Sequence, residues 1–597
     1  MQGAKNLLRY EVSAFESLNT TTSPNLLKKG ELVYAENVRQ EKVGLLATRD
    51  GSTVVGNNIS ATEEYGLFAF QAFSGKGLYR VCTVAATTSI YWLNSATWTS
   101  LSGAGLGTGI TAGEFKGCIA DGNLYLVNYN DENRMISGSD GTTVTDSTTV
   151  SGSFYNAPKA SLIAYYNDQL YLGDFLVGSV RNSTKVIHSS KSMGLVCLVN
   201  GDPASPYTTM SLTDTSYIYA VSGADTYDIY RGGSKVAVFT VTSLTEDTVT
   251  GTIVFESGFT TVQSSDEVWV ANTYSGSKIF RWPKNSSSTG SIEKEHGTFT
   301  LQSTDGSPLT ILDTIGNKLL ISNKTSMALF DGTTLDHFNT NIGCVSRNGY
   351  VKAFGAIFFI SYDGIYATDG SSSPKLMSKK ISNYFIGATK TGLEACAAGK
   401  KGNSIFFYLG SVTLYNEDGS TKSTIAKCTV EYDVSSNLFY IHSGVSMKYL
   451  LSGFANSSGT DRLLIATDDT STLVLDYLLG TTDNGTAIPI RFDFLLPPFS
   501  GKFDILSQPN EISVELLRGV GLKAFFSLDG DSFYPADHDA DKGSTIIRIP
   551  GKGDDFDTPP TCRRLGVSFR KNNSQKTVIA GFAVSYAKIE REQQLDK

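Results

Sequence analysis

Length, composition and charge narrow the class of protein before any motif is considered. The chain has 597 residues, more than one hydrophobic core normally supports, so several domains are expected. Charged residues make up only 18% and aromatic residues 11%, a balance that favours strands and tight turns over long helices. The formal net charge of −8 argues against a surface that binds nucleic acid through clustered Lys and Arg.

The start of the chain carries no targeting signal that the sequence pattern can identify. Residues 1–9 lack the apolar run of a signal peptide, and no stretch of 18 apolar residues predicts a transmembrane helix. We therefore expect a protein that is made in a cytosol and has no membrane segment. The seven cysteines are widely spaced, without a C-x-x-C pair, which predicts reduced core residues.

Residues 56–480 contain a weak repeat, in which a turn of Gly, Asp or Asn precedes a short run of large apolar residues. Residues 120–126, 166–172 and 315–321 are three copies. The first apolar residues of the seven copies are Leu78, Leu124, Leu170, Leu319, Ile357, Ile405 and Leu463. They are separated by 46, 46, 149, 38, 48 and 58 positions. Most of these steps match one four-stranded blade of about 40–50 residues, so the sequence predicts a β-propeller.

The single long step predicts an inserted domain near residues 200–275, in addition to one or two blades. Residues 236–241 and 248–254 alternate apolar and polar side chains with a period of two. This alternation is typical of strands with one buried face. We expect the insertion to be a small β-sandwich or barrel.

A separate C-terminal domain is predicted over residues 484–597, after a polar linker. Proline pairs at 497–498 and 559–560 interrupt the sequence. Several runs alternate in the manner of strands with one buried face. The expected strands are residues 512–517, 522–528, 545–549, 564–569 and 578–584. These strands predict a C-terminal β-sandwich, and the fold class is all-β.

No catalytic or cofactor-binding motif is present, so no enzymatic activity and no cofactor are expected. The sequence has no nucleophile elbow, zinc-binding His pair or phosphate-binding loop. One metal candidate remains, because Asp537, Asp539 and Asp541 alternate in a way that can direct carboxylates toward calcium. An EF-hand would need glycine in place of Lys542 and glutamate in place of Arg548. We interpret these residues as a possible structural calcium site, or else as a solvated acidic turn.

In the N-terminal segment, a polar stretch over residues 18–32 is followed by the pair Asn37-Val38 and then by Arg49-Asp50-Gly51. These motifs resemble the opening of tail nozzle proteins of short-tailed bacteriophages. Residues 361–370, with an Asp-Gly turn before an apolar-Tyr pair, are similar to a blade of the same family. The C-terminal pieces 526–530 and 563–567 resemble its closing β domain.

This family includes the tail tubular protein B and packaged-DNA stabilisation types. The resemblance implies a non-enzymatic virion protein of the phage tail, assembled in the host cytoplasm. Its subunits form a ring, generally a hexamer, that extends the DNA channel below portal and adaptor proteins and supports tail fibres or spikes. Residues 1–55 would be an N-terminal arm that packs on the platform. The alternatives are a receptor-binding or glycan-cleaving tail propeller and, more remotely, a bacterial surface adhesin.

Overall fold

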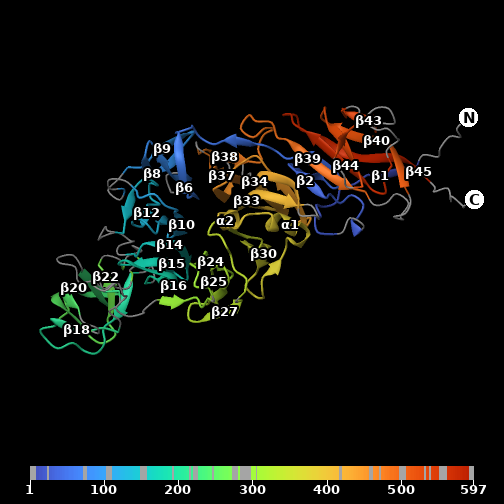
Figure 1. The fold of residues 1–597 in the computed structure, drawn as a ribbon. Helices are drawn as coiled ribbons and strands as arrows, with labels where there is room; N and C mark the ends of the chain where they lie inside the picture. Colours follow the sequence, from blue (N-terminus) through green and yellow to red (C-terminus); the bar gives the residue numbers. More distant parts are fainter. Residues whose placement is uncertain are drawn as a thin grey trace, which may run out of the picture.

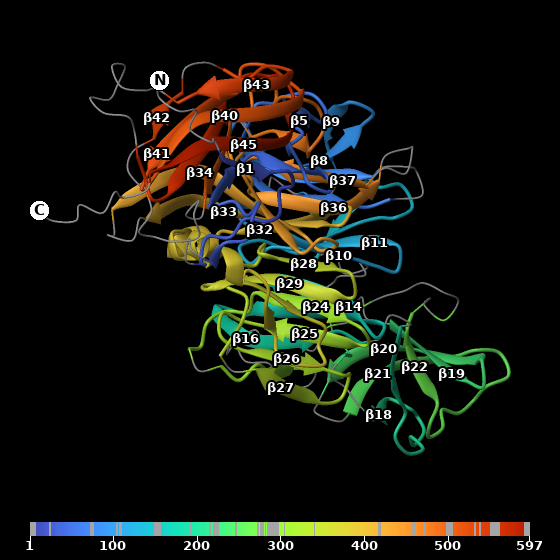
Figure 2. The same ribbon diagram turned by 90° about the vertical axis from the view of Figure 1, so that its right-hand side faces the viewer.

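The strands of the computed structural model form ten antiparallel sheets, which confirms the predicted all-β class. The described residues are 8–22, 26–71, 77–102, 106, 110–147, 157–190, 194–213, 217–218, 226–244, 248–271, 274, 280, 282, 298–303, 305–339, 341–415, 420–455, 461–469, 472–496, 506–529, 533–536, 539–549 and 561–589. Figures 1 and 2 show three parts: a propeller in the middle, a small inserted domain at one end and a two-sheet domain at the other.

Seven sheets of four strands each are the propeller blades, which follow one another in chain order, and the first strand named in each is the innermost. Blade 1 contains β6 (Ala61–Ala69), β7 (Leu78–Val84), β8 (Thr87–Asn94) and β9 (Thr97–Ser100). Blade 2 contains β10 (Lys116–Ala120), β11 (Asn123–Val127), β12 (Arg134–Ile136) and β13 (Val144–Asp146). Blade 3 contains β14 (Ala160–Tyr166), β15 (Gln169–Val177), β16 (Val180–His188) and β23 (Thr298–Thr300). Blade 4 contains β24 (Ile311–Ile315), β25 (Lys318–Ser322), β26 (Met327–Phe330) and β27 (Leu335–Asn339).

The remaining three blades follow the same plan. Blade 5 contains β28 (Tyr350–Ala353), β29 (Ala356–Ser361), β30 (Gly364–Thr368) and β31 (Lys375–Leu376). Blade 6 contains β32 (Ala397–Lys401), β33 (Ser404–Tyr415), β34 (Thr421–Asp433) and β35 (Leu438–His442). Blade 7 contains β36 (Tyr449–Ala455), β37 (Asp461–Ala466), β38 (Val474–Tyr477) and, outermost, β5 (Ser52–Val54).

The repeat in the sequence corresponds to the first hairpin of every blade. All seven marker residues, from Leu78 to Leu463, lie in the second strand of their blade, and each is at most 2% exposed. In blades 2 to 6, the turn before the second strand uses left-handed backbone, as at Asp121-Gly122 and Asn167-Asp168, because tight hairpin turns match the twist of antiparallel strands best with positive φ. Asn, Asp and Gly tolerate that conformation best. The polar turn and the apolar run are therefore two halves of one hairpin.

Apolar cores between neighbouring blades run around the whole ring. Blades 1 and 2 share one core, and blade 7 packs against blade 1 through Tyr449, Leu464 and Leu67. The ring is closed by β5, whose Ser52 pairs with Tyr477 of β38. A strand from before blade 1 thus completes blade 7, which ties the two ends of the propeller together.

The insertion is a six-stranded barrel between β16 and β23 of blade 3. Its strands are β17 (Leu195–Leu198), β18 (Thr209–Ser211), β19 (Thr226–Arg231), β20 (Ser234–Leu244), β21 (Thr248–Phe255) and β22 (Glu267–Val270). The sheet order is β17-β22-β19-β20-β21-β18. The bridge between Val199 and Leu212 joins the two edge strands, so the sheet closes on itself around its own apolar core. Of the two architectures expected for the insertion, the structure has the barrel.

Two sheets packed face to face form a β-sandwich from both ends of the chain. The first sheet contains β1 (Leu8–Val12), β3 (Val38–Lys42), β4 (Leu45–Thr48), β40 (Leu506–Arg518), β43 (Gly543–Arg548) and β45 (Val578–Ile589). The second contains β2 (Tyr34–Glu36), β39 (Ile490–Leu495), β41 (Lys523–Leu528), β42 (Tyr534–Pro535) and β44 (Leu565–Lys571). The rings of Phe494 and Phe582 meet between the sheets with centroids 4.8 Å apart.

The N-terminal segment differs from the separate arm that the sequence suggested. Its strands β1, β3 and β4 extend the first sheet of the sandwich, β2 is an edge strand of the second, and β5 belongs to blade 7. The reason is pairing over a long sequence distance: Leu8 to Val12 align with Tyr586 to Phe582. The N-terminal residues are therefore part of the sandwich rather than a segment lying on it.

Helices are few and short in the described residues. A 3-10 turn, η3 (Lys379–Ile381), precedes α1 (Ser382–Ile386) and α2 (Lys390–Glu394), and all three connect blade 5 to blade 6. None of the helices in these ranges is long and apolar enough to cross a membrane. All seven cysteines are unpaired.

Candidate functional site

The calcium candidate lies in a turn of the sandwich, just before β43. Asp539 and Asp541 are exposed, while Asp537 lies outside the described residues. The Asp541 carboxylate accepts a hydrogen bond from the backbone N–H of Gly521 at 3.1 Å. Within the ranges that the structure describes, no three His, Cys, Asp or Glu side chains are grouped so that they could hold a metal ion. A structural calcium site and a solvated acidic turn both stay predictions for these residues.

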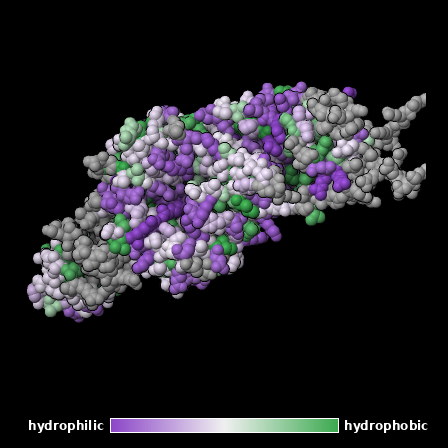
Figure 3. Space-filling view, in the orientation of Figure 1, coloured by the Kyte–Doolittle hydropathy of each residue, from purple (hydrophilic) through white to green (hydrophobic). Residues whose placement is uncertain are grey.

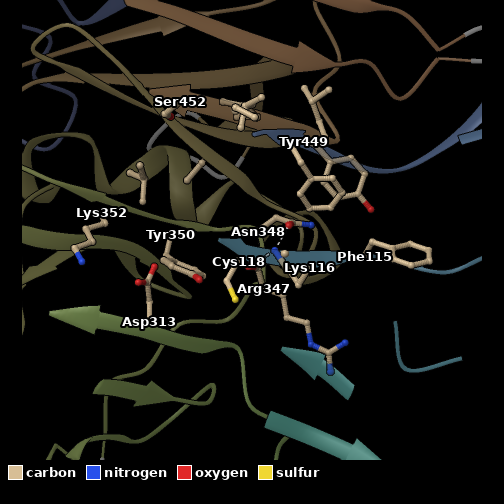
Figure 4. Close-up of a pocket in the computed structure, with 18 of the residues that line it drawn as sticks. Phe115, Lys116, Cys118, Asp313, Arg347, Asn348, Tyr350, Lys352, Tyr449 and Ser452 are labelled. Atoms are coloured by element: carbon tan, nitrogen blue, oxygen red, sulfur yellow. Dashed lines mark hydrogen bonds between the residues drawn. The ribbon is translucent and has the colours of Figure 1, made fainter. Parts of the chain in front are cut away.

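The central channel of the propeller is one concave site of the molecule. Its wall is formed by the innermost strands of the blades, and it contains two cavities of about 430 Å³ and about 560 Å³. Arg347, Asn348 and Tyr449 line both cavities. Figure 4 shows these three residues among those that line the smaller cavity.

A set of polar contacts, which we name the channel bridge, crosses the channel between non-adjacent blades. Lys116 begins the innermost strand of blade 2, and its ammonium donates to the carbonyl of Arg347 at 2.9 Å and to the Asn348 side chain. Arg347, ahead of blade 5, reaches blade 3, where it pairs with the buried carboxylate of Asp174. Figure 4 shows Lys116 directed at Asn348. The bridge therefore links blades 2, 3 and 5 across the channel.

Burial determines the protonation chemistry inside the channel. The pKa of Lys116 is lowered, chiefly because burial disfavours its charge, while the nearby Glu114 carboxylate, 3.5 Å away, opposes that shift. Burial also raises the pKa of Asp313 in the smaller cavity, and it raises the pKa of Tyr350 well above its usual value. Asp313 is the sole carboxylate among the described residues that line this cavity.

Lysines accompany every carboxylate on the wall of the larger cavity. The four acidic residues that line it are Glu63, Glu114, Glu394 and Asp468. Lys448 lies 3.5 Å from Glu63 and 3.8 Å from Asp468. Lys324 lies 2.7 Å from Glu394, and its hydrogen bond is the largest cause of the lowered pKa of Glu394.

This pairing is unfavourable for glycoside hydrolysis, the reaction considered for a propeller of this kind. That reaction needs one carboxyl with a raised pKa to donate a proton and a second carboxylate to act on the sugar or on water. Among the described carboxyl groups that line these two cavities, Asp313 has a raised pKa and lines the smaller cavity. The four acidic residues of the larger cavity lie beside lysines instead.

A buried polar network joins the sandwich to the propeller, and two of the motif residues are at its centre. The Arg49 side chain is fully buried, donates to the Asn37 side chain at 2.8 Å and forms an ion pair with Asp483. Asn37 also donates to the Ser443 hydroxyl, 406 positions away in the sequence, at 2.8 Å. A Cβ at Gly51 would lie 2.0 Å from the carbonyl oxygen of Thr482. The Asn-Val and Arg-x-Gly motifs therefore supply the contacts of this junction.

The same junction contains a buried histidine. His442 Nε2 lies 2.9 Å from Glu431, and Nδ1 lies 2.8 Å from the Tyr477 hydroxyl. Arg39 forms a second ion pair with Glu431 at 3.1 Å. Burial is the largest cause of the lowered pKa of His442, and the Glu431 carboxylate opposes it. Burial therefore disfavours the charged form of the ring.

None of the channel-bridge residues was predicted from the sequence. Lys116 and Arg347 belong to different blades, and each stands in a short segment without a recognisable motif. Asn37, Arg49 and Gly51 did stand out, but as marks of a resemblance and not as parts of a buried network. Sequence motifs report on neighbouring residues, whereas the channel is assembled from segments that are distant in the sequence.

Comparison with known proteins assigns no family. No family model matches the chain, and no curated protein matches it. Among solved structures, the computationally designed Ika8 protein is 10% identical, with a TM-score of 0.30 over 72% of this chain and 99% of that chain. AztD from Citrobacter koseri is 9% identical, with a TM-score of 0.26 over 69% and 96%. An exo-beta-1,3-galactanase from Phanerochaete chrysosporium is 10% identical, with a TM-score of 0.20 over 89% and 100%. At these scores the similarities carry no functional argument.

Proposed function

We propose that this chain is a structural, non-catalytic subunit of the tail nozzle of a short-tailed bacteriophage. The observation that supports this most is the junction of sandwich and propeller. Asn37, Arg49 and Gly51, which carry the family resemblance, are the residues that make its buried contacts. A ring subunit needs such a junction, because a load transmitted through the tail must not separate its domains.

In this proposal the DNA channel runs along the axis of a ring of subunits, generally six, and not through the propeller of any one subunit. The channel bridge supports this arrangement, since Lys116, Asn348 and Arg347 make contacts across the bore of the propeller. Identical subunits related by rotation make head-to-tail contacts that close into a ring. Adaptor or portal-proximal proteins would contact one face of the ring, and tail fibres or spikes its periphery.

The net charge of the subunit fits transient passage of DNA. A wall rich in Lys and Arg would retain the duplex through counterion release, with more affinity for each phosphate neutralised. The chain instead carries a formal charge of −8. We expect a neutral or acidic channel wall that repels the duplex and keeps it centred.

A reconstruction of the virion tail, with a DNA-binding assay on the purified protein, tests the proposal. The expected result is a closed ring on the tail axis and no tight, salt-sensitive binding of duplex DNA. A monomer at the periphery of the tail, or strong binding that weakens steeply with salt, would overturn it. Release of reducing ends from host capsule polysaccharide would favour the glycan-cleaving alternative, against which the lysine-paired carboxylates argue.

A further inference from the structure

Three aromatic rings cluster on the outside of the inserted barrel. Tyr230 and Tyr274 stack in parallel with ring centroids 3.8 Å apart, and Trp269 meets Tyr274 edge to face at 4.8 Å. Tyr274 is 37% exposed, and the other two rings are half-buried. We name these three residues the aromatic cluster.

The strand register explains why the cluster lies outside the core. In the pairing of β19 with β22, Tyr230 is opposite Glu267 and Asp228 is opposite Trp269. The alternate residues, Ile229 among them, point inward and fill the apolar core of the barrel. Because successive side chains of a strand point to opposite faces, core packing does not account for Tyr230 and Trp269, and Tyr274 follows β22 outside the barrel core.

Polar groups surround the cluster and hold its rings in place. The Trp269 indole N–H donates to the Glu267 carboxylate at 3.0 Å. Lys235 pairs with Asp228 at 2.8 Å and lies 3.8 Å from Glu256. The hairpin turn beside the cluster is Gly232-Gly233, and a Cβ at Gly233 would lie 3.4 Å from the Tyr274 hydroxyl. The turn therefore places no side chain next to that hydroxyl.

This combination of groups distinguishes the cluster from the other exposed apolar residues. On the face seen in Figure 3, hydrophobic residues occur in small scattered groups within a mostly hydrophilic surface, and such isolated residues need no explanation. Fixed aromatic rings framed by carboxylates suit a ligand that presents both C–H groups and hydroxyls. A pyranose has this character, since its C–H face packs on an aromatic ring and its hydroxyls bond to carboxylates.

We propose that the aromatic cluster of Tyr230, Trp269 and Tyr274 is a binding site for a neutral saccharide. Three carboxylates, those of Asp228, Glu256 and Glu267, accompany one ammonium group, that of Lys235, so an anionic sugar is disfavoured by charge. The barrel lies at the end of the molecule opposite the sandwich (Figure 1), where a ligand on a large surface can reach it. The site does not depend on ring assembly, so its test is independent of the test of the proposed function.

The test is a titration of the full-length protein with neutral hexasaccharides of glucose, mannose and N-acetylglucosamine, followed by tryptophan fluorescence and calorimetry. A sialylated oligosaccharide is the anionic comparison. We expect at least one neutral saccharide to bind and the sialylated one to bind more weakly. Tyr274→Ala should lower the affinity about ten-fold through loss of a stacked ring, and Tyr274→Phe should retain most of it.

The controls separate loss of the site from loss of the fold. Tyr415→Ala removes a tyrosine that is 53% exposed on blade 6, and it should leave binding unchanged. An unchanged melting temperature of Tyr274→Ala would show that the barrel is still folded. Absence of binding to every neutral saccharide, or equal affinity of wild type and Tyr274→Ala, would overturn the proposal. So would self-association that Tyr274→Ala abolishes, because the cluster would then be a contact between copies.

Discussion

The sandwich and the inserted barrel are both small β domains beside the propeller, yet they are joined to it in different ways. One continuous apolar core extends through the sandwich and into blades 4, 5 and 6, with Phe492 and Ile405 among its members. The core of the barrel contains only residues of the barrel. The sandwich and the propeller are thus one structural unit, while the barrel is an independent module.

Their charged groups show the same contrast. At the junction, the Arg49 side chain is fully buried and that of its partner Asp483 is mostly buried. In the barrel, the Glu256 carboxylate lies 3.8 Å from the Lys235 ammonium, and the Glu256 side chain is 47% exposed. A buried pair that loses one partner leaves an unpaired charge in a medium of low polarity, whereas an exposed pair is replaced by water. This difference can be measured.

The largest expected effect is that of Arg49→Ala. Removing the guanidinium leaves Asp483 and the Asn37 side chain without their partner, so the free energy of unfolding of the sandwich–propeller unit should fall by about 3–5 kcal/mol. Scanning calorimetry of the full chain measures the shift. The comparison variant in the barrel, Glu256→Ala, should cost less than about 1 kcal/mol, because Glu256 is exposed and Lys235 keeps its contact with Asp228. Equal shifts in the two variants would contradict the contrast between junction and barrel.

The next effect concerns the independence of the barrel. Ile229 is fully buried in the barrel core, and Ile229→Ala should destabilise that core by about 2–5 kcal/mol. Because the core is separate, only the calorimetric transition of the barrel should move to lower temperature. Val254→Ala, at a position 67% exposed on β21, is the control and should change neither transition. A common shift of both transitions would show that the barrel and the propeller unfold together.

A smaller effect is expected from pH at the junction. The lowered pKa of His442 means that its proton is bound more tightly in the unfolded chain than in the folded one. Its contribution to stability is complete above the unfolded pKa of about 6.5 and is lost as the pH falls toward the lowered folded value. Glu431, whose pKa is also lowered, adds to the loss at more acidic pH.

The variant His442→Gln isolates this contribution. His188 also has a lowered pKa because of burial, so the wild-type profile contains both histidines. Melting temperatures measured from pH 7.5 to 5 should fall less steeply in His442→Gln than in the wild type. Identical slopes would show that His442 does not contribute to the pH dependence.

The smallest expected effect is that of Asp539→Ala in the acidic turn of the sandwich. Asp539 is exposed, and exposed positions usually change stability by less than about 0.5 kcal/mol. The melting temperature should be unchanged, both with calcium and with chelator. A calcium-dependent increase in the wild type that Asp539→Ala removes would instead establish the predicted structural site, and titration calorimetry with calcium would measure its affinity.

The sequence by itself determined the strand content, the blade repeat and the position of the insertion. Each first hairpin of a blade needs a turn that tolerates positive φ and an apolar run that fills the space between blades, and these are contiguous in the chain, as at Asp121-Gly122 and Leu124. These local patterns depend on which residues tolerate positive φ and on the alternation of buried and exposed side chains along a strand. They therefore predict turns and strands without knowledge of the fold.

Only the tertiary structure decided how the ends of the chain pair and how the channel is filled. The pairing of β1 with β45 and of β5 with β38 joins segments from opposite ends of the sequence. The channel bridge brings Lys116 to Asn348, 232 positions away, and the junction brings Arg49 to Asp483, 434 positions away. Such contacts are made by single side chains whose partners are selected by the closed ring and the shared core. The sequence around Lys116 and Arg49 contains no periodic pattern that predicts these contacts. They can be identified only from the positions of the blades and sheets in the structure.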